Sequence, residues 1–109
     1  MFVGIMYAKL GMREKSLEQA RRELALTPRH PWTLYFAGKI HAILGDRQEA
    51  LGYLRAASAN GFLTIGWLDY HRRPHMGLHN LDKDPEFQAI HDDLSTKIEK
   101  LRRSNMNGK

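Results

Sequence analysis

Apolar residues recur every three or four positions along much of this chain, which is the spacing of one face of an α-helix. The clearest stretch lies between Pro31 and Gly45. Pro31 suits the first turn of a helix, where its missing N–H costs no hydrogen bond, and Gly45 suits a left-handed C-terminal stop. These signals predict a helix over residues 31–44.

A second helix is predicted directly after the first. Asp46 is a typical N-cap residue, and Glu49 stands three positions later, where its side chain can bond back to the cap. Apolar residues then recur at helical spacing until Asn60 and Gly61, which end the pattern. Residues 31–61 are therefore predicted to form an antiparallel helical hairpin.

The hairpin is predicted to occur twice, because a shift of 34 residues superimposes identical residues without a gap. The coinciding pairs are Phe2 with Phe36, Gly4 with Gly38, Ala8 with Ala42, Leu10 with Leu44, Gly11 with Gly45, Arg13 with Arg47, Leu17 with Leu51, Arg21 with Arg55 and Ala25 with Ala59. The first copy projects to a start before residue 1, so its first helix lacks an opening turn. We expect two hairpins, the first truncated, within residues 1–62.

These two copies resemble the tetratricopeptide repeat (TPR), a helical hairpin of the same length. The small and apolar positions of that repeat carry Leu34, Gly38, Gly45, Ala50 and Ala57 in the second copy. Gly38 and Ala50 would let the two antiparallel helices approach closely. The resemblance implies an all-α fold, a right-handed α-α superhelix of antiparallel helical hairpins with a C-terminal capping helix.

Residues 63–109 are predicted to close the same domain with an irregular third helix, a loop and the capping helix. Asp84 is an N-cap candidate and Pro85 suits a first helical position. The apolar stripe after them predicts a helix over about residues 85–103, with fraying from residue 104.

The closing segment has a resemblance of its own, to the end of bacterial TPR arrays. It is carried by Gly61-Phe62, Trp67-Leu68 and Asp84-Pro85-Glu86-Phe87. This resemblance implies that the chain is the terminal regulatory part of a larger bacterial signalling protein, although a small free-standing adaptor stays open.

TPR-like proteins bind protein or peptide partners in a concave groove lined by the first helix of each hairpin. The groove positions of the family fall on Ile5, Trp32, Tyr35 and Lys39. Aromatic side chains beside one lysine suit an anchor site, because rigid aromatic area loses little entropy on binding. The alternative, that Trp32 and Tyr35 pack in the core or against a preceding repeat, stays open.

Two further functions compete with this one. A homodimer would cover the apolar residues Phe2, Ile5 and Met6 of the truncated helix. Weak nucleic-acid binding through arginine pairs is disfavoured, because carboxylates flank the pair at Arg72 and Arg73 and the net charge of +5 is spread along the chain.

Catalytic and metal chemistry find little support in the sequence. The chain has no cysteine, which excludes disulfides and thiolate zinc sites and fits a cytoplasmic protein. His71, His75 and His79 are spaced by four, but Pro74 interrupts the helix that would align them, so we expect solvated or hydrogen-bonded loop histidines. We therefore expect no enzyme, no metal and no cofactor. The apolar stretch at the start is too short to span a membrane.

Overall fold

The computed structural model describes residues 2–62, 65–73 and 76–107 of the chain. These residues form α-helices, one short 3-10 helix and no β-strand, so the expected all-α class is confirmed. The helices are α1 (Phe2–Lys9), α2 (Arg13–Leu26), α3 (Pro31–Leu44), α4 (Arg47–Ala59), α5 (Ile65–His71), η1 (His79–Leu81) and α6 (Pro85–Asn107). None of the helices in these ranges is long and apolar enough to cross a lipid bilayer.

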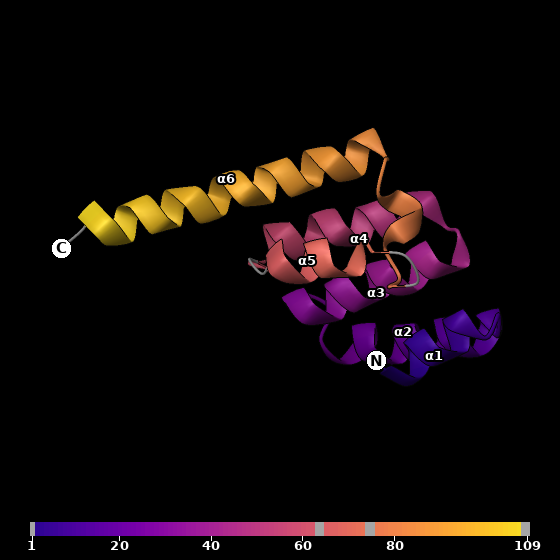
Figure 1. Cartoon of the computed structure of the whole chain (residues 1–109). Helices are drawn as coiled ribbons and strands as arrows, with labels where there is room; N and C mark the ends of the chain where they lie inside the picture. Colours follow the sequence, from indigo (N-terminus) through magenta and orange to yellow (C-terminus); the bar gives the residue numbers. More distant parts are fainter. Residues whose placement is uncertain (1, 63–64, 74–75, 108–109) are drawn as a thin grey trace.

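α3 lies at the centre of the molecule. It packs against α4 to form one hairpin, and it also contacts both α1 and α2 of the preceding hairpin. η1 reaches α3 as well, while α6 packs across α4 and contacts α5. Figure 1 shows α1 and α2 on one side of α3 and α6 on the other side of α4, with the outer end of α6 extending past the other helices.

The two hairpins turn at equivalent glycines. Gly11 (φ 77°) and Gly45 (φ 83°) both adopt the left-handed conformation that residues with side chains rarely adopt. The sequence predicts Asp46 as the N-cap of α4, but its side chain makes no cap hydrogen bond. Arg13 donates to its two carboxylate oxygens instead, at 3.1 and 2.9 Å, and His41 Nδ1 lies 2.9 Å away. The carboxylate therefore links the two hairpins rather than capping a helix.

The close approach of α3 to α4 depends on Gly38. A Cβ atom at this position would lie 3.0 Å from Cγ of Leu54 and 3.2 Å from the carbonyl oxygen of Ala50. Gly4 is the matching residue of α1, and a Cβ there would lie 3.0 Å from Cδ1 of Ile40. The small residues of the repeat pattern thus lie where helices touch.

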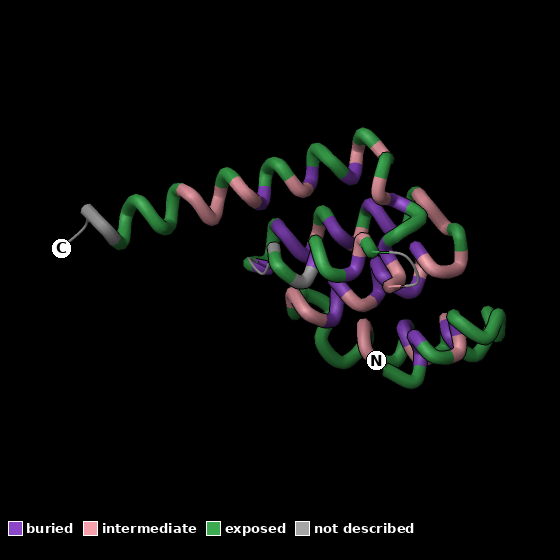
Figure 2. Tube along the Cα trace, in the orientation of Figure 1, coloured by how far each residue is buried: buried purple, intermediate pink, exposed green. Residues whose placement is uncertain are grey.

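α6 is attached to the body at its N-terminal end. Asp84 caps the helix as predicted, accepting hydrogen bonds from the backbone N–H groups of Glu86 at 2.9 Å and Phe87 at 3.3 Å. Arg47 of α4 bonds to both Asp84 and Glu86. The helix continues to Asn107, so the fraying expected from residue 104 does not occur over residues 104–107. Figure 2 shows buried positions along the part of α6 next to α4 and exposed positions beyond it.

Two glycine substitutions should have opposite effects on stability. We expect Gly38→Ala to lower the free energy of unfolding by about 1–3 kcal/mol, because the methyl group forces α3 and α4 apart. Gly52→Ala is the matched control on the exposed side of α4, where nothing lies within 4 Å of the new Cβ. That change should raise the free energy of unfolding by about 0.5–1 kcal/mol. Urea denaturation followed by circular dichroism measures both, and equal effects would contradict the close-packing assignment.

Candidate functional site

The predicted groove residues are largely buried. Tyr35 is 0% exposed, Ile5 is 5% exposed and Lys39 is 7% exposed, while Trp32 is half-buried. Ile5 packs with Ile40 in the small apolar cluster between the hairpins. The expected exposure of this face is therefore wrong, and the alternative in which Tyr35 belongs to the core is the one that the structure shows.

The chain itself covers this face of α3, through Phe62 and the end of α5. The rings of Tyr35 and Phe62 stack with centroids 4.5 Å apart and an interplanar angle of 9°. Trp32 meets Phe62 edge-on at 5.0 Å. Aromatic pairs in these geometries add to the stability that area burial gives. Phe62, three residues after the end of α4, thus covers an aromatic face that could have received a peptide.

A buried polar cluster lies beside these rings. The hydroxyl of Tyr35 is hydrogen-bonded to Nδ1 of His71, and the ammonium of Lys39 lies 3.3 Å from Nε2 of the same ring. An ammonium group only donates, so Nε2 accepts and Nδ1 carries the proton that is donated to the Tyr35 oxygen. His71 is 2% exposed, at the end of α5. The loop position expected for this histidine is wrong, whereas its hydrogen bonding is confirmed.

Burial shifts the pKa of each member of the cluster in the direction that favours the neutral side chain. Desolvation lowers the pKa of His71 from 6.5 to about 4, with a smaller contribution from the positive charges of Lys39 and Lys9. Desolvation, with a smaller contribution from the positive charge of Lys9, lowers the pKa of Lys39 from 10.5 to about 8. Burial raises the pKa of Tyr35. At neutral pH the imidazole is therefore uncharged, and the lysine carries a charge at a cost in stability.

The residue that closes over Lys39 has to be a glycine. Gly77 adopts φ 99°, and a Cβ atom there would lie 2.5 Å from Cε of Lys39. The aliphatic part of the lysine thus packs directly under this backbone. The cluster is enclosed by the chain, and this enclosure suits a structural polar core rather than a site that a substrate reaches.

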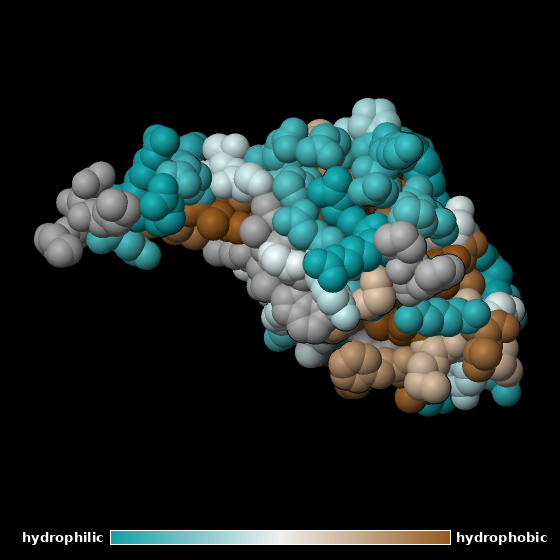
Figure 3. Space-filling model, viewed as in Figure 1, coloured by the Kyte–Doolittle hydropathy of each residue, from teal (hydrophilic) through white to brown (hydrophobic). Residues whose placement is uncertain are grey.

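An exposed apolar surface lies on α1 and on Leu10, the residue that directly follows it. Phe2 is 73% exposed, Val3 51%, Met6 62% and Leu10 70%. We call these four residues the α1 surface. Figure 3 shows hydrophobic residues gathered over this part of the molecule, in contrast with the hydrophilic face around α6. A contiguous apolar patch of this kind on a folded chain is typical of an interaction site.

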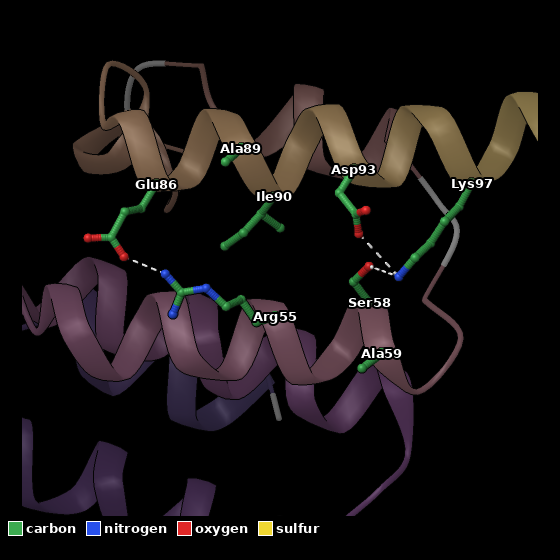
Figure 4. A pocket seen from close by; sticks show the side chains of 8 residues that line it. All are labelled: Arg55, Ser58, Ala59, Glu86, Ala89, Ile90, Asp93 and Lys97. Atoms are coloured by element: carbon green, nitrogen blue, oxygen red, sulfur yellow. Dashed lines mark hydrogen bonds and ion pairs between the residues drawn. The ribbon is translucent and has the colours of Figure 1, made fainter.

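A cleft lies between α4 and α6, with a volume of about 360 Å³. Figure 4 shows Ile90 pointing from α6 toward α4 between two polar bridges. At one end Arg55 pairs with Glu86. At the other end Lys97 lies 3.1 Å from the Ser58 hydroxyl.

Two alanines are among the residues that line this cleft. Asp93 lies 3.2 Å from Lys97 at the second bridge, and Ala59 and Ala89 line the opening. We call this hollow the α4–α6 cleft. Sequence patterns do not indicate it, because its lining residues come from two helices that only the tertiary fold brings side by side.

Most of the arginines in the adjacent pairs that could contact nucleic-acid phosphates, at positions 21–22, 72–73 and 102–103, form ion pairs with carboxylates. Arg22 pairs with Glu18 at 3.1 Å. Arg72 pairs with Asp69 at 3.1 Å and with Asp82 at 3.0 Å. The pair at residues 102 and 103 is bound to a single glutamate, at position 99. These guanidinium groups are partly neutralised, which weakens the case for a phosphate-binding surface.

The three evenly spaced histidines do not come together in the described ranges. His71 is buried in the cluster with Tyr35, and Nδ1 of His79 lies 3.2 Å from the carbonyl oxygen of Arg72. His75 lies outside the described residues. Over the part of the chain that the structure describes, no three histidine or carboxylate side chains are placed to hold a metal ion.

Comparison with models of protein families, with curated proteins and with solved structures finds no match to this chain. A function for it therefore rests on the placement of its own residues. Two features of the surface are candidates, the α1 surface and the α4–α6 cleft. In the interior, the cluster of Tyr35, Lys39 and His71 joins α5 to α3.

Protonation of His71 should destabilise the fold in acid. Its pKa of about 4 in the folded chain lies below the ordinary 6.5, so the unfolded chain binds the proton more readily between these values. Stability is therefore lost as pH falls from 6.5 toward 4, by up to about 1.4 kcal/mol per pH unit. Urea denaturation at several pH values, for the wild type and for His71→Phe, isolates this contribution. A constant difference between the two proteins from pH 7 to pH 4.5 would refute it.

Removing the buried charge of Lys39 should stabilise the fold. We expect Lys39→Met to raise the free energy of unfolding at pH 7 by about 1–3 kcal/mol, because the ammonium is desolvated there. The pKa of the folded state is lowered to about 8, so the gain should shrink as pH rises from 8 toward 10.5. Lys100→Met, at an exposed position of α6, is the control and should change stability by less than about 0.5 kcal/mol. A loss of stability in Lys39→Met at pH 7 would contradict the expectation.

Proposed function

We propose that this chain is a protein-interaction module built from two TPR-like hairpins, and that a partner docks on the α1 surface. The observation that carries the proposal is the exposure, from 51% to 73%, of three large apolar side chains on α1 and of Leu10, which directly follows the helix. Leaving such side chains in water costs free energy that a docked partner would recover.

The TPR-like architecture is part of the proposal and is supported by the equivalence of the two hairpins. Gly4 and Gly38 occupy matching positions at close helix contacts, and Gly11 and Gly45 occupy matching left-handed turns. α3 packs against both helices of the preceding hairpin, as expected for hairpins stacked in a superhelix.

The geometry of the α1 surface suits a helical partner. Phe2, Met6 and Leu10 are four residues apart, so their side chains form a ridge along α1. A ridge of this kind packs between the side chains of a second helix that presents its own apolar stripe. The partner segment we propose is therefore an amphipathic helix.

The charges around the α1 surface suit an acidic partner. Lys9 is exposed at the end of α1, and Lys15 lies over the ring of Tyr7 at 5.7 Å. α2 also carries Glu14, Glu18 and Glu23, of which Glu18 is paired with Arg22 at 3.1 Å. Glutamates or aspartates flanking the apolar stripe of the partner would meet these lysines, which favours encounter and orientation.

A homodimer through the same surface remains the second candidate, since two α1 ridges could pack on each other. It would bring Lys9 and Lys15 of one copy near those of the other. Like charges at the rim of an interface oppose association. The acidic amphipathic helix is therefore the better match to the charges of this face.

Binding can be tested with a synthetic helix. The probe is a fluorescein-labelled peptide of about 20 residues with leucines along one face and glutamates on the other. We expect it to bind the wild type, and Met6→Glu to weaken binding at least about tenfold, equivalent to about 1.4 kcal/mol. Fluorescence anisotropy measures both affinities.

Two controls make the result specific. Leu101→Glu changes an exposed leucine on α6 and should leave the affinity unchanged. A peptide with lysines in place of glutamates should bind more weakly than the acidic one. Equal affinities of the wild type and Met6→Glu for the acidic peptide would exclude the α1 surface as the docking site.

A further inference from the structure

α6 is much longer than the helix that supports it. Its 23 residues correspond to a length of about 34 Å, whereas the 13 residues of α4 correspond to about 20 Å. The outer part of α6 accordingly extends past the other helices in Figure 1. Residues 100–105 are all exposed.

The apolar stripe of α6 continues into this outer part. Phe87 is 0% exposed and Leu94 is 1% exposed, where the helix packs on the body. Leu101 lies seven residues beyond Leu94 on the same side of the helix, yet it is 49% exposed. Short ion pairs from Glu99 to Arg102 and Arg103 support the helix locally. Such exposed pairs contribute little, so a long outer helix gains most from packing against a partner.

The α4–α6 cleft lies along the same side of α6. Its lining residues Glu86, Ile90, Asp93 and Lys97 recur every three or four positions, and Leu101 is the next position of that row. This row of α6 thus has the cleft near its N-terminal end and the exposed side chain of Leu101 near its C-terminal end. When a second α6 is laid antiparallel to the first, the leucine of each helix comes to lie beside the cleft of the other. The hollow of about 360 Å³ has room for a leucine side chain and lies over the apolar side chain of Ile90.

The charges of α6 are also complementary to themselves when the helix is reversed. Its N-terminal half carries Glu86, Asp92 and Asp93 and no lysine or arginine. Its C-terminal half carries four basic residues with one glutamate; the basic residues are Lys97, Lys100, Arg102 and Arg103. Two such helices laid antiparallel place each acidic half beside a basic half, whereas a parallel pair places like charges together.

We propose that α6 forms the interface between two antiparallel copies of this chain, with Leu101 of each copy seated in the α4–α6 cleft of the other. The pairing is related by a two-fold axis, so each contact is made twice. The ion pair that bridges the cleft, Arg55 with Glu86, is exposed, and so is the Asp93–Lys97 pair within α6. Exchanging these pairs for pairs between copies therefore costs little. This interface is separate from the α1 surface and leaves that surface free for another protein.

Site-directed cross-linking tests the arrangement directly, because the natural chain contains no cysteine. Ala89→Cys places a thiol at the cleft and Leu101→Cys places one at the protruding leucine. The two positions are twelve residues apart on one helix, about 18 Å, too far for a disulfide within a chain. Under mild oxidation, a mixture of the two single variants should form a disulfide-linked dimer far faster than either variant alone. The antiparallel pairing would be overturned if Leu101→Cys alone formed a disulfide-linked dimer faster than the mixture did. It would also be overturned if the mixture formed the linked dimer no faster than the single variants.

Sedimentation equilibrium gives an independent test on the unlabelled protein. The wild type should approach twice its 12.6 kDa mass as concentration rises from about 1 μM to 1 mM. Leu101→Asp should remain monomeric over that range, with the helix content of the wild type by circular dichroism, because Leu101 is half exposed. Met6→Glu is the matched control on the α1 surface and should dimerise normally. A wild type that stays monomeric at all these concentrations, or a dimer lost in Met6→Glu and retained in Leu101→Asp, would overturn the proposal.

Discussion

The contact between α3 and α4 at Gly38 is the constraint on which the rest of the structure depends. Without a side chain there, the backbone of α3 comes within reach of Leu54 and the Ala50 carbonyl. This approach brings the two helices into one unit, against which α1 and α2 pack on one side and α6 packs on the other. Arg13, bound to Asp46, ties the outer hairpin to the turn of the central one. Gly4 lies at an equivalent contact in the first hairpin, so both hairpins depend on a glycine where their helices approach closely.

The covering of α3 explains why the expected groove is closed. Tyr35 stacks on Phe62, is hydrogen-bonded to His71 through its hydroxyl and is 0% exposed, so its ring is not available to a peptide. Lys39 then becomes buried beneath Gly77, with its positive charge opposed by desolvation and by Lys9. A buried polar cluster of this kind costs free energy at neutral pH, and it constrains where α5 can sit. Because His71 joins α5 to α3 in its neutral form, the stability of this contact depends on pH.

The two proposed surfaces lie on different helices and complement each other. The α1 surface is apolar with lysines at its rim, whereas the outer part of α6 carries charges of both signs around one leucine. A dimer through α6 would present two α1 surfaces in one particle. A partner with two acidic amphipathic helices could then bind both at once, and the second binding event would be intramolecular. Modest affinity at each surface would thus suffice for stable association.

Local patterns determined the helices of this protein but not which of their faces meet. The helix over residues 31–44, the Asp84 cap and the all-α class follow from apolar spacing and from proline and glycine positions, which act through neighbouring residues. The burial of Tyr35 and Lys39, the role of His71 and the α4–α6 cleft were decided by tertiary contacts over more than thirty residues. Periodicity specifies the apolar side of a helix, whereas exposure depends on what the remainder of the chain lays against that side.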